Sequence, residues 1–84
     1  MKYFVYILKS LKDSTFYIGF TSNLGKRLTE HNKGKCKYTK GHIPYKIIHF
    51  ETFDIKKKAK QQEKYIKSIK NTSRYLKMIG SPES

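Results

Sequence analysis

Two stretches decide the fold: KYFVYILK at residues 2–9 and TFYIGF at residues 15–20. The first contains six consecutive aromatic, β-branched or leucine residues. Such a run is too short for a helix and too apolar for a strand with one face in water. We therefore predict a strand over 2–9 that is covered on both sides. Asp13 and Ser14 favour a turn after it, which predicts an antiparallel hairpin with a second strand over 15–20.

Apolar residues recur at helical spacing in two segments that follow the hairpin. Ser22 is a suitable N-cap for a helix over 23–33, and Gly34 stands where that helix should end. Asp54 is a suitable N-cap for a second helix over 55–70. The apolar stripe of this second helix comprises Ile55, Ala59, Ile66 and Ile69.

One more strand and one short helix complete the expected domain. The strand is YKIIHFETF at residues 45–53, and the helix lies at about 75–79. The resulting order ββαβαα predicts a small α+β domain, in which a mostly antiparallel three-stranded sheet is flanked by helices. We expect one domain over 1–80 and a flexible tail over 81–84.

The charge balance points to a polyanionic partner. In 84 residues, 19 Lys and Arg stand against 6 Asp and Glu, a formal net charge of +13. Nucleic acid is favoured over a membrane surface because its charge is denser. A lone cysteine, Cys36, excludes a disulfide scaffold within the chain, and no apolar run approaches the ~20 residues of a membrane span. We expect a cytoplasmic protein without a signal peptide.

Three lysines at residues 56–58 fall in the first turn of a predicted helix, where the helix dipole disfavours cations. This placement suggests phosphate contacts, although a solvated run of charge is the alternative. The lysines that we expect to bind DNA are Lys26, Lys33, Lys35, Lys37, Lys40, Lys56 and Lys57.

Two tyrosines are predicted to meet on one face of the hairpin. If the turn is centred between Lys12 and Asp13, Tyr6 lies opposite Gly19 and diagonal to Tyr17. Both phenols then reach one site, or both are core aromatics with their hydroxyls at the rim. Gly19 favours the first interpretation, because glycine inside a strand often marks a close approach to the backbone.

Arg27 and His31 are four residues apart on the first predicted helix and therefore share a face. Guanidinium binds phosphate oxygens in pairs, and histidine transfers protons near neutral pH. The alternative is a surface pair between Arg27 and Glu30, with His31 merely ending the helix.

Glu63 is one of only six acidic residues and flanks the apolar stripe of the second helix. A carboxylate at this position is a candidate ligand for one Mg²⁺ or Mn²⁺ ion. An ion pair with Lys60 or Lys67 is the structural alternative. The three histidines and Cys36 lack the spacing of a zinc site.

Taken together, these motifs resemble the GIY-YIG nuclease superfamily. The resemblance rests on FVY at residues 4–6, YIG at 17–19, the segments YIGFTSNLGKRLTEHNKG and KYTKGHIP, and Glu63 in a later helix. It extends from residue 3 to about 79 and is strongest to the small stand-alone branch, whose relatives include the amino-terminal domain of an excinuclease subunit.

The resemblance implies a role for each of these residues. Tyr6 and Tyr17 match the two motif tyrosines, of which the first helps to deprotonate the attacking water. Arg27 matches the arginine that holds the scissile phosphate. His31 matches the residue that assists Tyr6, and Glu63 matches the single acidic ligand of the cation.

Two positions depart from the family pattern. Phe4 replaces the first glycine of the first tripeptide, and the asparagine that supports the site in many relatives has no secure counterpart, Asn71 being the nearest.

The sequence therefore predicts a metal-dependent DNA endonuclease that uses one Mg²⁺ or Mn²⁺ ion. Branched and damaged DNA are candidate substrates, a protein partner is left open, and no membrane is expected. The main rival is a non-catalytic nucleic-acid-binding module with the same fold. A basic adaptor for an acidic protein or a membrane surface is a weaker rival.

Overall fold

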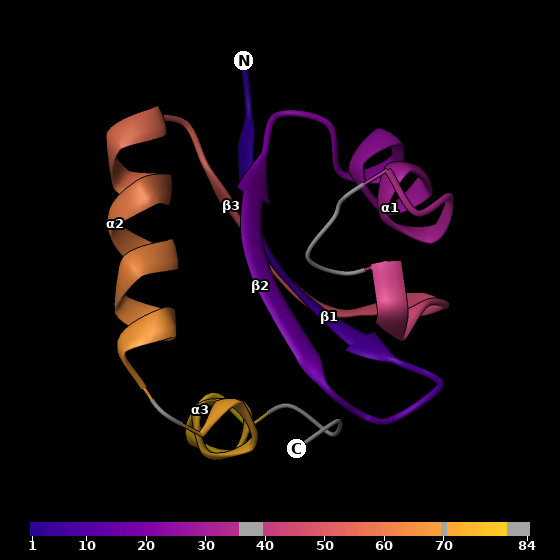
Figure 1. The fold of residues 1–84 in the computed structure, drawn as a ribbon. Helices are drawn as coiled ribbons and strands as arrows, with labels where there is room; N and C mark the ends of the chain where they lie inside the picture. Colours follow the sequence, from indigo (N-terminus) through magenta and orange to yellow (C-terminus); the bar gives the residue numbers. More distant parts are fainter. Residues whose placement is uncertain (36–39, 70, 81–84) are drawn as a thin grey trace.

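The fold places one antiparallel sheet between helices on its two faces (Figure 1). The computed structural model describes residues 1–35, 40–69 and 71–80. The strands are β1 (Tyr3–Ser10), β2 (Phe16–Thr21) and β3 (Tyr45–Phe53), and the helices are α1 (Leu24–Asn32), α2 (Lys56–Ser68), α3 (Thr72–Met78) and the short 3-10 turn η1 (Lys40–His42). The sheet order is β2-β1-β3, so both the predicted α+β class and the predicted order ββαβαα are confirmed.

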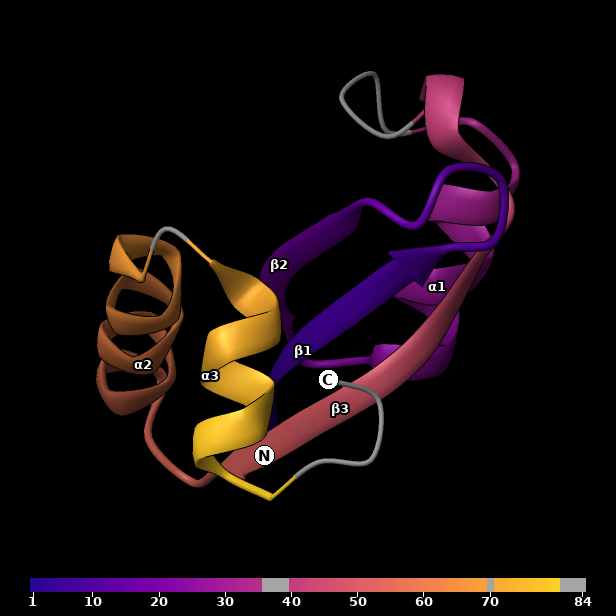
Figure 2. The same ribbon diagram turned by 90° about the horizontal axis from the view of Figure 1, so that it is seen from below.

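The central strand β1 is covered on both sides, as its sequence predicts. Val5 and Ile7 pack with α2 and α3, while Tyr6 and Leu8 pack on the opposite face with α1. All four side chains are at most 1% exposed. Figure 2 shows the same separation from below, with α1 on one side of the sheet and α2 and α3 on the other.

The hairpin has the predicted register. Tyr6 pairs with Gly19, and β2 begins one residue later than predicted, at Phe16. Asp13 fixes the turn, because its Oδ1 accepts hydrogen bonds from the backbone and the hydroxyl of Thr15 at 3.2 and 2.7 Å. This register brings the two motif tyrosines to the same face of the sheet.

The ends of α1 are close to the prediction, with one correction. Asn23, not Ser22, is the N-cap, and its side chain accepts a hydrogen bond from the Lys26 backbone at 3.1 Å. Gly34 follows the C-cap with a φ of +75°, a left-handed conformation that favours glycine.

The start of α2 differs from the prediction. Asp54 does not cap the helix, because its carboxylate binds the Lys2 ammonium at 2.8 Å instead. Ile55 is the N-cap residue and is 52% exposed, so it does not belong to the apolar stripe. Ala59 and Ile66 are fully buried, as predicted.

The third helix begins three residues before its predicted start. Asn71 caps α3, its side chain accepting a hydrogen bond from the Arg74 backbone at 3.2 Å. Buried Tyr75 and Leu76 then pack α3 against the sheet.

Candidate active site

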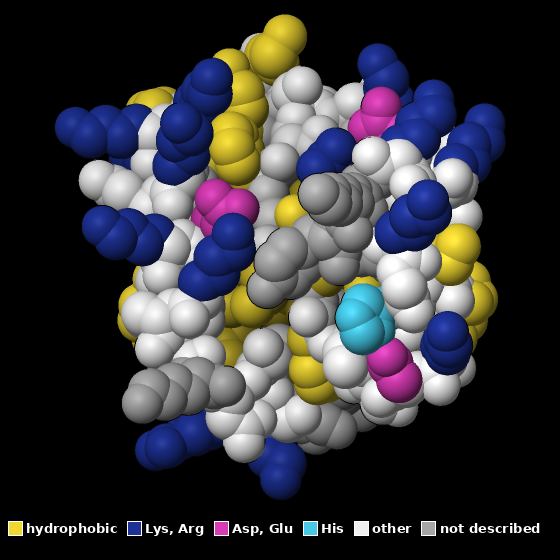
Figure 3. Space-filling view, viewed as in Figure 1, with side chains coloured by type: hydrophobic (Ala, Val, Ile, Leu, Met, Phe, Trp, Pro, Cys, Tyr) yellow, Lys and Arg dark blue, Asp and Glu magenta, His cyan; other side chains and the backbone are white. Residues whose placement is uncertain are grey.

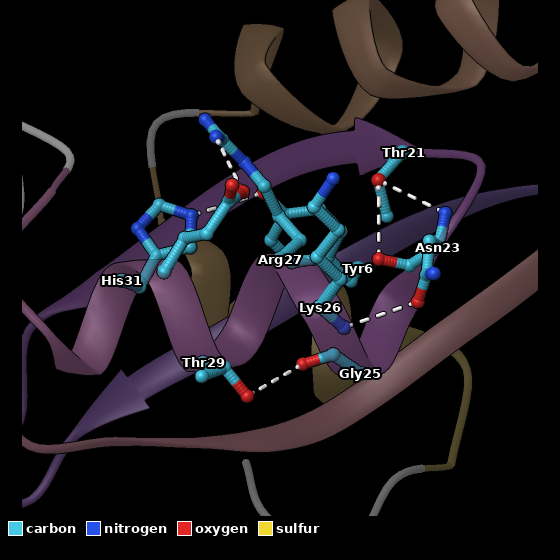
Figure 4. Close-up of polar contacts among 9 residues, drawn as sticks. Tyr6, Thr21, Asn23, Gly25, Lys26, Arg27, Thr29 and His31 are labelled. Carbon is cyan, nitrogen blue, oxygen red and sulfur yellow. Dashed lines mark hydrogen bonds and ion pairs between the residues drawn. The ribbon is translucent and has the colours of Figure 1, made fainter.

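Three of the predicted site residues meet at the hydroxyl of Tyr6. The Tyr6 oxygen lies 3.1 Å from His31 Nε2 and 3.4 Å from Arg27 Nε. Tyr6 comes from the middle of β1, whereas Arg27 and His31 project from successive turns of α1 toward it (Figure 4). The structure therefore brings these three of the five predicted site residues together at one oxygen.

Gly19 makes room for this cluster. A Cβ atom at residue 19 would lie 2.6 Å from the Tyr6 oxygen and 3.2 Å from a ring carbon of Tyr17. The first distance is too short for any side chain unless Tyr6 moves, so the close approach of Tyr6 to β2 requires glycine. Tyr17 lies diagonal to Tyr6, with ring centroids 6.3 Å apart, and its ring packs against His31 at 4.8 Å.

Burial and charge set the protonation of the cluster. His31 is fully buried, and burial lowers its pKa, with a further lowering from the positive charge of Arg27. His31 is therefore neutral at pH 7 and can accept a proton. The pKa of Arg27 is raised above its ordinary value by its hydrogen bond to the Tyr6 hydroxyl, so the guanidinium stays charged.

Arg27 also contacts Glu30, one turn along the same helix. Arg27 Nη1 lies 3.5 Å from Glu30 Oε1, and the two side chains are 35% and 31% exposed. The surface pair and the site contact are therefore not alternatives, because the guanidinium makes both with different nitrogens. Arg27 is the member of the cluster that reaches solvent, since Tyr6 is only 1% exposed.

The end of α1 is fixed by a residue that the sequence analysis did not single out. The Asn32 side chain accepts a hydrogen bond from the Tyr45 backbone nitrogen at 2.6 Å and donates one to the Tyr45 carbonyl at 3.1 Å. Asn32 thus ties α1 to β3 directly after His31. Its only signal in the sequence is its position next to His31 in the motif EHNKG.

Glu63, the predicted metal ligand, lies on α2 and forms one of the two ion pairs considered from the sequence. Its Oε2 is 3.3 Å from Lys67 Nζ, and its side chain is 21% exposed. Ion pairs at this spacing on a helix contribute only about 0.3–0.5 kcal/mol, so Lys67 alone does not prevent the carboxylate from binding another cation. Among the described residues, no group of three or more His, Cys, Asp or Glu could hold a metal ion. One accessible carboxylate nevertheless suits Mg²⁺, which keeps several waters as ligands.

The predicted DNA-binding lysines lie on both sides of the sheet. Lys37 lies outside the described residues. The other predicted lysines are all exposed, namely Lys26, Lys33, Lys35, Lys40, Lys56 and Lys57. Figure 3 shows Lys and Arg side chains gathered over α2 and over α1. The described helices offer no membrane span, being too short and too polar.

A second polar cluster on the opposite face of the sheet was not predicted. Glu51 Oε2 accepts a hydrogen bond from the Tyr75 hydroxyl at 2.6 Å and lies 2.9 Å from His49 Nε2. Gln62 donates to the other oxygen of Glu51 at 3.0 Å. The scarcity of acidic residues, which drew attention to Glu63, applied equally to Glu51.

The two departures from the motif have structural roles. Phe4 packs edge-to-face against Phe50, with ring centroids 6.1 Å apart. Asn71 caps α3 through its side chain.

Comparison with known proteins identifies the fold and its motifs. The family model described as the GIY-YIG catalytic domain matches residues 2–76. The chain belongs to the GIY-YIG family. Membership implies nuclease activity and a nucleic-acid substrate, and GIY-YIG nucleases typically use a divalent metal.

Similar proteins in this family are UPF0213 proteins. UPF0213 protein CPE1444 of Clostridium perfringens is 44% identical over 79 residues, covering 93% of this chain and 83% of its own. UPF0213 protein NP_0776A, a relative from Natronomonas pharaonis, is 44% identical over 68 residues. The match covers 80% of this chain and 79% of the relative. The solution NMR structure of UPF0213 protein BH0048 from Bacillus halodurans is 30% identical, with a TM-score of 0.61 and coverage of 98% of this chain and 89% of that one.

Proposed function

We propose that this GIY-YIG domain is a divalent-metal-dependent endonuclease that hydrolyses phosphodiester bonds in DNA. The observation that supports this most strongly is the meeting of Tyr6, Arg27 and His31 at one phenolic oxygen. Phosphodiester hydrolysis needs an activated water, a cation on the phosphate and stabilisation of the leaving oxygen. The residues of this site supply the first two.

Tyr6 and His31 form the path for the proton of the attacking water. The ordinary pKa of tyrosine, about 10, makes it a weak base at neutral pH. A neutral His31 3.1 Å away can take the phenolic proton onto Nε2 as the Tyr6 oxygen takes one from water. The guanidinium of Arg27 favours this transfer, because a nearby cation stabilises the negative charge that develops on the phenol.

Arg27 is the residue that binds the scissile phosphate. Its Nε is occupied by Tyr6 and its Nη1 by Glu30 at a long 3.5 Å, while its side chain is still 35% exposed. A phosphate at the exposed end of the guanidinium therefore lies next to the Tyr6 oxygen. Tyr6 and His31 are buried, so water would have to reach the Tyr6 oxygen past Arg27, the exposed member of the cluster.

Glu63 is the residue that would hold the metal ion. When bound there, the ion supplies positive charge to the phosphate and to the leaving oxygen. The remaining ligands would be water and substrate, as Mg²⁺ prefers.

Nicking of supercoiled DNA tests this function. We expect nicked product in Mg²⁺ or Mn²⁺ and none with a chelator, and a panel of flap, junction, single-stranded and duplex substrates then identifies the preferred structure. If the pure protein binds these DNAs but leaves every one intact in both metals, the non-catalytic binding module is the correct interpretation. That rival gives Glu63 no part in binding, because a carboxylate repels phosphate.

The metal role of Glu63 is tested separately by Mn²⁺ binding, measured by electron paramagnetic resonance without DNA. Glu63→Gln should lose the bound Mn²⁺ signal and the cleavage activity while retaining DNA binding. Asp54→Asn is the matched control, since it also removes one carboxylate paired with a lysine. Equal Mn²⁺ binding by wild type and Glu63→Gln would disprove the assignment.

A further inference from the structure

The outer face of α2 carries a row of lysines along a shallow groove. The groove is lined by Lys56, Lys57, Lys60, Gln61 and Lys64. Residues 56, 60 and 64 are spaced by four, so they follow one another along one side of the helix. All four lysines are exposed.

None of these four lysines forms an ion pair with an acidic side chain in the described ranges. The five described acids pair elsewhere: Asp13 with His42, Glu30 with Arg27, Glu51 with His49, Asp54 with Lys2, and Glu63 with Lys67. The first turn of α2 contains no acid, and its N-cap makes no side-chain hydrogen bond. Cations at this end oppose the helix dipole, so an external anion would stabilise the helix.

The row reaches β2, the edge strand of the sheet, on the side covered by α2. Lys60 Nζ lies 5.8 Å from the centre of the Phe20 ring, and Phe20 directly follows Gly19 on β2. Glu63 is one turn beyond Lys60 on the same helix. The helix with Arg27 lies on the other face of the sheet, so two basic surfaces flank the β2 edge (Figures 1 and 3).

We propose that the lysine row of α2 is a backbone-binding track that holds nucleic acid outside the bond to be cut. Residues 56–64 span about 12 Å of helix, a length that matches about three to four phosphates along one strand of B-DNA at about 3.4 Å each. This inference rests on the proposed function, because it assigns the flanking part of the same substrate. The sequence predicted Lys56 and Lys57, whereas Lys60 and Lys64 follow from the structure.

The test measures DNA binding by fluorescence anisotropy in chelator, with a short labelled duplex and a salt titration. The variant combines Lys57→Gln with Lys64→Gln and keeps the contact between Lys60 and the Phe20 ring. The matched control is Lys58→Gln with Lys77→Gln, which removes two exposed lysines outside the groove. Each lost phosphate contact lowers the slope of log K against log salt by about 0.9.

We therefore expect the groove variant to lose about 1.8 from the slope, and the control to lose much less. Equal losses in both variants would mean diffuse attraction and overturn the track. Tighter binding of wild type to anionic phospholipid vesicles than to the duplex would also overturn it, in favour of a membrane surface. Because binding is measured without metal, it is independent of cleavage: a chain that cuts normally but shows no groove effect contradicts this inference alone.

Discussion

The two faces of the sheet carry polar clusters built from similar residues, with opposite charge at the centre. On the α1 face, the Tyr6 hydroxyl contacts a buried histidine and the guanidinium of Arg27. On the α2 and α3 face, the Tyr75 hydroxyl contacts Glu51, which in turn contacts a histidine. Each cluster therefore combines a tyrosine, a histidine and one charged group.

The sign of that charge separates a reactive phenol from an inert one. Burial and the Glu51 carboxylate raise the pKa of Tyr75 to about 12, so Tyr75 keeps its proton and donates it in a fixed hydrogen bond. Tyr6 instead accepts a hydrogen bond from a cation, which favours loss of its proton. We infer that the first cluster serves chemistry and the second joins α2 and α3 to β3.

The largest expected effect is that of Tyr6→Phe on cleavage. Removing the hydroxyl removes the proton path, and a general base contributes about 10²–10⁴-fold to rate. Nicking rates in Mg²⁺ should fall by this factor. Unfolding experiments should show a loss of about 1–3 kcal/mol, since the buried His31 and Arg27 each lose a hydrogen-bond partner. Preserved cleavage with a large loss of stability would instead make Tyr6 a core aromatic.

Gly19→Ala should affect both activity and stability, because the new methyl group would lie 2.6 Å from the Tyr6 oxygen. Displacing a side chain in a packed core costs about 1–3 kcal/mol, and cleavage should fall as Tyr6 moves. Gly25→Ala is the control, since nothing lies within 4 Å of its Cβ position. Chemical denaturation and nicking assays measure both variants. A Gly19→Ala protein as active and stable as Gly25→Ala would contradict the close packing.

Tyr75→Phe should affect stability without affecting cleavage. Losing a hydrogen bond to a charged group costs about 1.5–3 kcal/mol. The wild-type contribution is complete below the unfolded pKa near 10 and disappears as the pH rises through about 12. The difference in unfolding free energy between Tyr75→Phe and wild type should therefore shrink over this range. A defect in nicking by a fully folded Tyr75→Phe would place the second cluster in the reaction.

The cluster on the α1 face could be predicted from the sequence, whereas the cluster on the α2 and α3 face could not. Tyr6, Gly19 and Tyr17 lie on one hairpin, whose register follows from the turn, and Arg27 and His31 are related by a helical repeat. Such local periodicity can be read directly.

Glu51, Gln62 and Tyr75 come instead from three separate elements. Their meeting depends on how α2 and α3 dock on the sheet, which no local spacing encodes. The same reason limited the prediction for Glu63, whose position relative to Tyr6 depends on helix docking, so its metal role stays a prediction.

The smallest expected effect is that of Glu30→Gln, which removes the charge beside Arg27 but keeps the shape. The Glu30 charge raises the pKa of His31, opposing burial and Arg27. Without it that pKa falls further, so His31 stays neutral to lower pH and the acid limb of the pH–rate profile moves to lower pH. Release of Arg27 should tighten DNA binding by less than about fivefold, as expected for an exposed pair. The shift is measured from nicking rates between pH 5 and 8 and from nuclear magnetic resonance titration of the His31 ring. Asp54→Asn is the control for a distant change of charge. A limb that moves to higher pH would show that Glu30 acts on the site through something other than its charge.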